Sequence, residues 1–371
     1  APRPGLAAEA RATLALSGPI VLTNLSQMAL ALTEALLLGR LGTDALAAAM
    51  LATSLHFALI APGFGLALAA APLQAMARGS ARSMRRATRA GLWAAGLAIL
   101  PAWVLLWNAA AVLRALGQDP ALAALAQDYT RAAMFGMPGF CAFIALRGFL
   151  AAMERPAAAM WVAIGAVVLN LPIAWLLIFP AGLGVLGAGL SITIAETAML
   201  VALLVLIRRD RVFRRFRLLG RVWRLNLDWL RRVATVGLPI AGTMLLEIGI
   251  FSAAALAMGW FGAVAAAAHA IAIQTASTSF MVPMGIGQAA TARVGLALGA
   301  GRMADAARAG WVAIALGAGF MAVMAAVLLL AAGVIARGFL DAADPRAAEV
   351  AALGATLLAV AGVFQLADGV Q

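Results

Sequence analysis

The sequence has 371 residues and a net charge of +12; 65% of its residues are hydrophobic, 11% are charged, and the mean hydropathy is +1.00. A soluble domain is about a quarter charged and less than half apolar, so a water-soluble fold could not cover this much apolar surface. The composition excludes a soluble enzyme and favours an all-α protein that crosses a lipid bilayer several times.

Arginine supplies all of the basic charge, and the arginines gather in the gaps between apolar segments. Anionic lipid head groups would meet them there, so we expect contact with membrane lipids and no binding of nucleic acid. The single cysteine, Cys141, excludes an internal disulfide and is expected to be a small core residue.

Ten apolar segments are long enough to cross about 30 Å of hydrocarbon as helices, which takes roughly 20 residues each. Several contain proline, which breaks a helix in water but only kinks it where neighbouring helices satisfy the freed carbonyls. These prolines are Pro62, Pro72, Pro101, Pro138, Pro172 and Pro283. The segments lie at about 14–38, 48–77, 90–113, 124–150, 157–179, 185–207, 234–258, 264–291, 309–336 and 348–370.

The arginines also predict the orientation, because 22 of them fall on one side of the expected spans and five on the other. The richer side is the cytoplasmic one, so both ends of this chain should face the cytoplasm. Ten arginines lie in the gap 208–232, among Phe213, Phe216, Trp223 and Trp229. We expect this gap to be a basic amphipathic helix on the inner leaflet that links two halves, with a regulatory or partner-binding role as the alternative.

An internal repeat connects the two halves, because a shift of 220 residues aligns special backbone positions. The aligned pairs are Pro19 with Pro239, Gly39 with Gly259, Gly42 with Gly262 and Gly65 with Gly285. The first copy contains six spans, which predicts parallel six-helix bundles related by an axis along the membrane normal, with a substrate cleft between them. We expect lobes at 1–207 and 233–371; the second holds four of six helices, so this chain should be part of a twelve-helix protein.

Four carboxylates lie within expected spans, where a charge costs about 2.5–3.5 kcal/mol at the helix centre on insertion scales. Glu247 lies eight residues past Pro239, and Asp368 lies near the inner end of the last span. A carboxyl group in such a place can exchange a proton for a cation, so these two residues are the predicted coupling site. Glu34, near the outer end of its span, is either functional or merely hydrated, and Glu196 belongs to no recognisable motif.

Other polar residues are weaker candidates. Asn24 and Gln27 share a helix with Glu34, and Asn170 could hydrogen-bond Glu34 or serve only as helix-packing glue. His56 and His269 are lone histidines in apolar stretches, where packing is the simpler role and proton relay the alternative.

No metal-ligand spacing and no phosphate-binding loop occurs in the required context. We therefore expect no cofactor and no metal beyond a possible Na⁺ at Glu247 and Asp368. An ion gradient, rather than ATP, is the expected energy source.

Three motifs make the sequence similar to the multidrug and toxic compound extrusion family in its NorM-like branch. The run from Pro19 to Gly42 with Glu34 inside it resembles the first helix of that family. Gly237-Leu-Pro239-Ile followed by Glu247 resembles its seventh helix, and Phe364-Gln365-Leu-Ala-Asp368 its tenth.

The resemblance implies a monomeric secondary transporter of the bacterial inner membrane. Its twelve helices form two lobes that export amphipathic organic cations in exchange for Na⁺ or H⁺. Family residues that match Glu247 and Asp368 form a cation site in the C-terminal lobe, and those that match Glu34 and Asn170 belong to a proton- or cation-responsive site in the other lobe.

Two departures from the family pattern favour the Glu247 and Asp368 pair as the coupling site. The first-helix position is usually Asp in the family and is Glu34 here, and Ala174 stands where some members have an Asp one turn beyond Asn170. The competing interpretations are a flippase for lipid-linked precursors, which would line its cleft with arginines, and a membrane-embedded enzyme or receptor scaffold.

Overall fold

The computed structural model describes residues 5–218, 220, 222–339 and 346–370, and every regular element among them is a helix. The contacts divide the chain into two compact units. Unit 1 contains the described residues up to Val21, Leu246–Val294 and those from Arg302 onward. Unit 2 contains Leu22–Leu245 and Gly295–Gly301. These units differ from the lobes expected from the sequence, because the first residues group with the last helices, and residues 233–245 group with unit 2.

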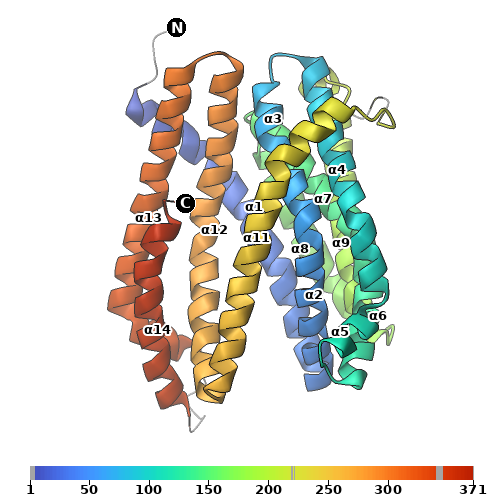
Figure 1. Ribbon diagram of the computed structural model, residues 1–371, viewed down its shortest axis with the longest axis vertical. Coiled ribbons are helices and arrows are strands. Elements are labelled where there is room, and N and C mark those ends of the chain that lie inside the picture. Colours follow the sequence, from blue (N-terminus) through green and yellow to red (C-terminus); the bar gives the residue numbers. More distant parts are fainter. Residues whose placement is uncertain (1–4, 219, 221, 340–345, 371) are drawn as a thin grey trace. The chain divides into compact units, whose positions relative to one another are not determined.

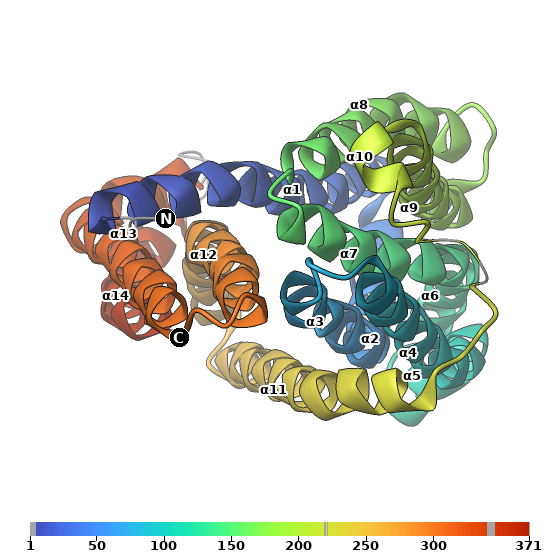
Figure 2. The ribbon, with the colours of Figure 1, turned by 90° about the horizontal axis from the view of Figure 1, so that it is seen from above.

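Unit 2 is built from the second half of α1 and the helices that follow it (Figure 1). Within it α8 packs along α9, and α2 packs against α4 (Figure 2). Its elements are α1 (Leu6–Leu41), α2 (Thr43–Leu68), α3 (Ala70–Met76), α4 (Ala81–Trp107), α5 (Ala109–Ala115), α6 (Pro120–Ala133), the 3₁₀ turn η1 (Met134–Gly136), α7 (Met137–Ala152), α8 (Ala157–Ile178), α9 (Gly184–Arg209), α10 (Arg211–Arg214) and the first half of α11 (Leu227–Trp260).

Two of the predicted spans are interrupted at their prolines. Proline cannot donate to the carbonyl four residues before it, and α2 ends at Leu68, four residues before Pro72. Pro138 likewise frees the carbonyl of Met134, where the helix changes to the 3₁₀ turn η1. The indole Nε1 of Trp103 donates to that carbonyl at 2.8 Å. A neighbouring helix therefore satisfies the freed group, as expected for a helical bundle.

Unit 1 contains α13 (Met303–Gly338), which packs along α14 (Ala347–Asp368), together with most of α12 (Ala263–Gly299). The first half of α1 also belongs to unit 1, where an ion pair with a buried acid and a partly exposed arginine joins it to α12. Arg293 Nε lies 2.9 Å from Glu9 Oε1, and Arg293 Nη2 lies 2.7 Å from Glu9 Oε2. Such a bidentate pair fixes both position and orientation, so it fastens the start of α1 to unit 1.

The basic segment between the halves is not the continuous amphipathic helix that the sequence predicted. Only α10 is helical before α11 begins at Leu227, and the described residues between them form turns. Phe213 and Phe216 are buried with their rings 5.6 and 5.7 Å from that of Phe149. Both phenylalanines therefore pack into the core of unit 2 instead of facing lipid. The chain leaves the helical conformation after Arg214, between the two rings.

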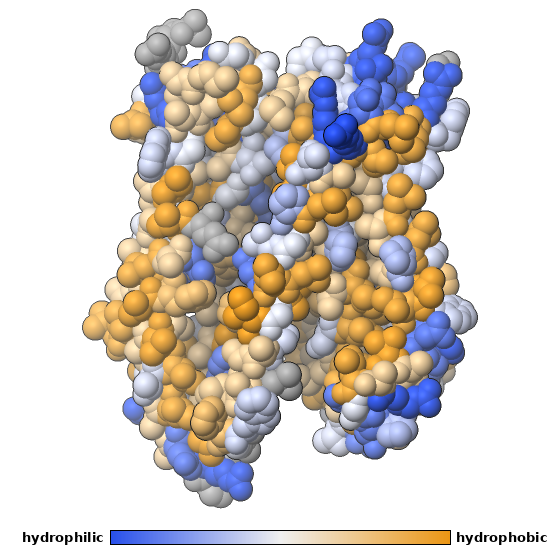
Figure 3. Space-filling model, viewed as in Figure 1, coloured by the Kyte–Doolittle hydropathy of each residue, from blue (hydrophilic) through white to orange (hydrophobic). Residues whose placement is uncertain are grey.

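Among the described residues, nine helical stretches are long and apolar enough to cross a membrane. The predicted span 264–291 lies within α12, which is helical throughout but is not one of the nine. On the face shown in Figure 3, mostly apolar side chains cover the middle of each unit, and hydrophilic ones gather mainly at its ends. The chain is a multi-pass, all-α membrane protein, as its composition predicted.

Candidate functional site

The predicted coupling pair comes together in unit 1. Glu247 lies on α11 and Asp368 is the last residue of α14, and the two carboxylates are close enough to interact through their charges. Glu247 is exposed, and Asp368 is half-buried. Two carboxylates side by side repel each other, so a monovalent cation or a proton between them lowers the energy of both.

The neighbourhood of Asp368 is held by close packing and one buried hydrogen bond. One turn before it, the fully buried amide of Gln365 donates to the hydroxyl of Ser279 on α12. A Cβ at Gly369, directly after Asp368, would lie 2.8 Å from the Cβ of Met321 on α13. The end of α14 is thus tightly packed against two other helices of unit 1, which fixes the position of the Asp368 backbone.

A second polar cluster lies inside unit 2. The carboxylate of Glu34 on α1 accepts a hydrogen bond of 2.9 Å from the hydroxyl of Tyr129 on α6. Ser191 of α9 lies within hydrogen-bonding reach of the same carboxylate, and Glu196, also on α9, is close enough to interact with its charge. Glu34 is only 6% exposed. The hydrated alternative for Glu34 is therefore wrong, because a hydroxyl of the bundle takes the place of water.

Two glycines of α9 allow this helix to pack closely against its neighbours in the cluster. Any Cβ at Gly189 would collide with the carbonyl oxygen of Tyr129, and one at Gly187 would lie 2.7 Å from the carbonyl oxygen of Leu177 on α8. Without side chains at these positions α9 approaches both α6 and α8 closely. The glycines therefore help to set the distance between α9, which carries Ser191 and Glu196, and Tyr129 of α6.

The remaining members of the predicted N-terminal polar site do not join Glu34. Asn24 precedes Glu34 by ten residues, about 15 Å along a helix, and its Oδ1 accepts a 2.8 Å hydrogen bond from Nη1 of Arg147. Asn170 is buried on α8, and neither of its side-chain polar atoms has a hydrogen-bond partner among the described residues. Of the two alternatives for Asn170, the hydrogen bond to Glu34 is therefore absent among the described residues, which leaves the packing role.

Three further candidate residues each have a buried polar atom without a hydrogen-bond partner among the described residues. Gln27 is half-buried, and its Nε2 lacks a partner among the described residues. Similarly, Nδ1 of His56 and Nε2 of His269 are buried without described partners. The described residues contain no group of three or more His, Cys, Asp or Glu side chains that could hold a metal ion.

Sequence reasoning missed two of these residues. Tyr129 is the one tyrosine in the whole sequence, and this rarity in an apolar segment is the signal that could have identified it. Arg147 falls within the expected span 124–150 and lies inside α7, where it is 4% exposed. The expectation that the arginines gather in the gaps between spans is therefore wrong for this residue.

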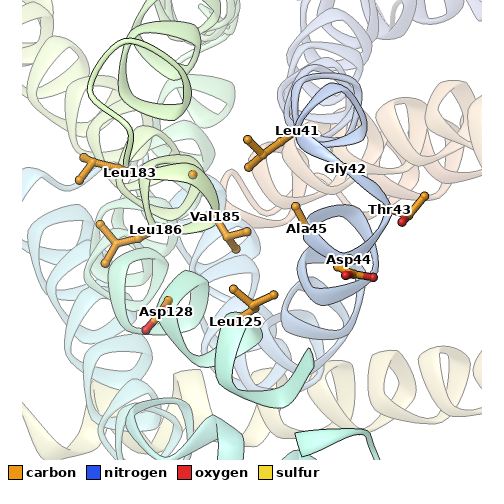
Figure 4. A pocket seen from close by; sticks show the side chains of 11 residues that line it. Leu41, Gly42, Thr43, Asp44, Ala45, Leu125, Asp128, Leu183, Val185 and Leu186 are labelled. Atoms are coloured by element: carbon orange, nitrogen blue, oxygen red, sulfur yellow. The ribbon is translucent and has the colours of Figure 1, made fainter. Parts of the chain in front are cut away.

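A cavity of about 450 Å³ lies in unit 2 beside the turn between α1 and α2. In Figure 4 the carboxylates of Asp44 and Asp128 lie on opposite sides of it, with Leu125 and Val185 between them. Positive φ angles at Gly42 (147°) and Gly184 (52°) form the turns of its rim. None of the predicted site residues lines this cavity.

Comparison with known proteins places this architecture in a family. The MatE family profile matches residues 19–176 and 239–371. The "Probable multidrug resistance protein NorM" of Mesorhizobium japonicum is 43% identical over 372 residues, which cover 98% of this chain and 79% of that relative. A protein of the same name from Pseudomonas aeruginosa is 35% identical, over 98% of this chain and 76% of that relative.

Solved structures agree in fold. The crystal structure of a eukaryotic MATE transporter matches with a TM-score of 0.87 at 21% identity, covering 99% of this chain and 81% of that chain. An outward-facing multidrug resistance MATE family transporter matches with a TM-score of 0.79 at 21% identity, covering 96% of this chain and 79% of that chain. The resemblance read from the three sequence motifs is thus confirmed, and the chain belongs to the MatE family, the multidrug and toxic compound extrusion transporters.

Proposed function

We propose that this protein exports amphipathic organic cations from the cytoplasm in exchange for Na⁺ or H⁺, by alternating access. Its relatives are named multidrug resistance proteins, and its fold is that of MATE transporters. The protein is a monomeric carrier of the bacterial inner membrane with a cytoplasmic N-terminus, and it is not an enzyme. The excess of arginine in the predicted cytoplasmic gaps supports this orientation.

The observation that carries the proposal is the Glu247 and Asp368 pair. The two carboxylates lie on different helices of unit 1 and interact through their charges. An inorganic cation or proton bound there neutralises this repulsion, and an organic cation bound nearby would do the same. The two therefore compete for the same negative charge, and this competition is the exchange step of an antiporter.

The proposal requires water to reach Glu247, whose side chain the protein itself leaves exposed. Cysteine accessibility tests this point, since the native Cys141 is buried and adds little background labelling. A Glu247→Cys variant should react with a charged, membrane-impermeant thiol reagent. Leu246→Cys, one residue away and 70% exposed, serves as the control on another face of α11. Labelling of position 247 by lipophilic reagents alone would contradict the proposal.

Transport in proteoliposomes tests the coupling itself. We expect ethidium efflux from the complete protein to depend on a Na⁺ or an H⁺ gradient. Glu247→Gln and Asp368→Asn should each lower the coupled rate about tenfold or more, which corresponds to about 1.4 kcal/mol in the barrier. Glu349→Gln, an exposed acid in the first turn of α14, is the control for loss of one charge. Wild-type rates in the first two variants under both gradients would show that coupling occurs elsewhere.

A further inference from the structure

Arg147 is a buried cation whose contacts supply no opposite charge. It lies on α7 in unit 2 and is 4% exposed, and no other arginine among the described residues is buried. Its recorded hydrogen bond runs from Nη1 to Oδ1 of Asn24, a neutral oxygen, at 2.8 Å. A guanidinium is charged at every accessible pH, so Arg147 cannot avoid the cost of burial by losing a proton. An anion is the group that would balance this charge.

The described acids do not provide that anion. None of them forms a recorded ion pair with Arg147, and the recorded salt bridges of unit 2 involve arginines that are more than a third exposed. Glu34 lies ten residues from Asn24 on the same helix, about 15 Å away, and accepts its hydrogen bond from Tyr129. The charge of Arg147 is therefore left for an anionic ligand to balance.

Asn24 adds a second hydrogen-bond donor beside the guanidinium. Because a guanidinium only donates hydrogen bonds, it takes the oxygen of the Asn24 amide and leaves the NH₂ group to find an acceptor elsewhere. Nδ2 of Asn24 is buried without a hydrogen-bond partner among the described residues, and the residue is 3% exposed. Helices α1 and α7 thus place a positive charge next to an unused N–H donor. An anion suits this arrangement, since it accepts hydrogen bonds and carries the missing charge.

Gln74 of α3 holds the part of α7 that carries Arg147. Its Nε2 donates to the hydroxyl of Thr88 and to the carbonyl oxygen of Ala145, both at 3.0 Å. A Cβ at Gly148 would lie 2.8 Å from Oε1 of Gln74, so α7 approaches α3 closely beside Arg147. This packing fixes the backbone from which Arg147 extends, and a site held in this way loses little conformational freedom when a ligand binds.

We propose that Arg147 and Asn24 form a binding site for one anionic group, a halide or a carboxylate, inside unit 2. The guanidinium supplies a charge-assisted hydrogen bond, and Nδ2 of Asn24 supplies a second bond to the same anion. A free inorganic anion and the carboxylate of a zwitterionic passenger share this chemistry. The site itself does not depend on the proposed exporter function, whereas its occupation by a passenger does.

The line width of ³⁵Cl in sodium chloride solutions tests the binding, with sodium formate as the competing carboxylate. We expect the complete wild-type protein in detergent micelles to broaden the line saturably, and formate to reverse the broadening. Arg147→Gln should abolish the saturable part. Asn24→Asp should abolish it too and should keep the protein folded, because its carboxylate pairs with Arg147 from within. Arg82→Gln, the same loss of charge at an exposed residue of α4, is the control and should retain it.

Two dyes distinguish the sources of the anion in proteoliposomes. Rhodamine 110 carries a free carboxylate, and rhodamine 123 is its methyl ester. A passenger carboxylate predicts that Asn24→Asp lowers the transport of rhodamine 110 about tenfold or more and leaves that of rhodamine 123 nearly unchanged, because only the acid loses a charge-assisted hydrogen bond. Equal transport of both dyes by this variant, together with lost chloride binding, assigns the site to an inorganic anion.

The proposal is overturned if the wild type shows no saturable broadening, or if Asn24→Asp broadens the line as the wild type does. Loss of the saturable part in Arg82→Gln would also overturn it, because chloride would then bind at the surface. If neither dye follows an ion gradient while chloride still binds, the exporter function is wrong and the anion site stands.

Discussion

In unit 1 the buried acid Glu9 lies against the guanidinium of Arg293, whereas in unit 2 the buried acid Glu34 accepts a hydrogen bond from the neutral hydroxyl of Tyr129. A guanidinium is charged at every accessible pH and forms a bidentate, charge-assisted contact with the carboxylate beside it. A tyrosine hydroxyl stabilises a carboxylate without neutralising it. An acid paired with Arg therefore has a structural role, because it holds two helices together. An acid paired with Tyr keeps its capacity to take up a proton.

The same distinction applies to the arginine of unit 2. Arg147 is buried, but its recorded hydrogen bond goes to the amide of Asn24 and not to Glu34 or Glu196. Among the described residues, unit 2 thus contains the buried cation Arg147, the buried acid Glu34 and the half-buried acid Glu196, and no ion pair joins the cation to either acid. Burial alone therefore does not identify an acid that can take up a proton. The chemical nature of the group that contacts the acid is the better guide.

Removal of Arg293 should have the largest effect, because it leaves Glu9 buried and charged without its partner. Arg293→Gln should lower the free energy of unfolding by about 3–5 kcal/mol, the usual cost of breaking a buried ion pair. Denaturant titration in mixed micelles measures it. The double variant Glu9→Gln with Arg293→Gln should recover most of the loss, and equal losses in the single and double variants would mean that the ion pair contributes little.

Tyr129→Phe tests the neutral partner in unit 2. The variant keeps the ring and removes the hydroxyl, so Glu34 loses its 2.9 Å hydrogen bond. We expect a loss of about 1–3 kcal/mol, the cost of leaving a buried polar group unsatisfied. In a Glu34→Leu background the same substitution should cost nearly nothing, because no acid then needs the hydroxyl. An undiminished cost in that background would assign the effect to packing instead.

Much of the fold follows from the sequence, and the reasons for the misses are physical. Apolar segments of about 20 residues predict membrane helices because lipid leaves the backbone no other way to satisfy its hydrogen bonds. Glu34, Glu247 and Asp368 stand out because charge is rare in such segments. Their partners do not, since Tyr129 lies 95 residues from Glu34 and only tertiary packing brings the two side chains together.

The prediction of an amphipathic helix for the basic segment 208–232 is wrong for a related reason. Its alternation of arginine and aromatic residues is typical of a helix on a lipid surface, and the pattern is real. The pattern does not show that Phe149 offers Phe213 and Phe216 a pocket in the protein core, which wins over the lipid surface. Tertiary packing of this kind is invisible in a single sequence.

A matched pair of glycines tests how α9 positions the acids of unit 2. At Gly189 a Cβ would collide with the carbonyl oxygen of Tyr129, whereas at Gly165 on α8 nothing lies within 4 Å. Gly189→Ala should destabilise the protein by about 0.5–2 kcal/mol, because overpacking outweighs the gain in helix propensity. Gly165→Ala should instead stabilise it by up to about 1 kcal/mol. Denaturant titration compares the two, and equal signs would contradict the close approach of α9 to α6.

The smallest expected effect belongs to the exposed counterpart of the Glu9 pair. Arg78 Nη1 lies 2.7 Å from Glu154 Oε2, the same distance as in the Arg293 pair, but the side chains are 38% and 34% exposed instead of 21% and 5%. Arg78→Gln should therefore cost only about 0.2–1 kcal/mol, because water screens an exposed pair. Raising the salt concentration to about 1 M shortens the screening length to roughly 3 Å and should abolish this cost. Most of the cost of Arg293→Gln should persist in the same salt, since Glu9 is only 5% exposed and salt screens a mostly buried pair less. If both costs disappear together, water reaches Glu9 as easily as it reaches Glu154, and the contrast between a structural fastening in unit 1 and titratable acids in unit 2 is lost.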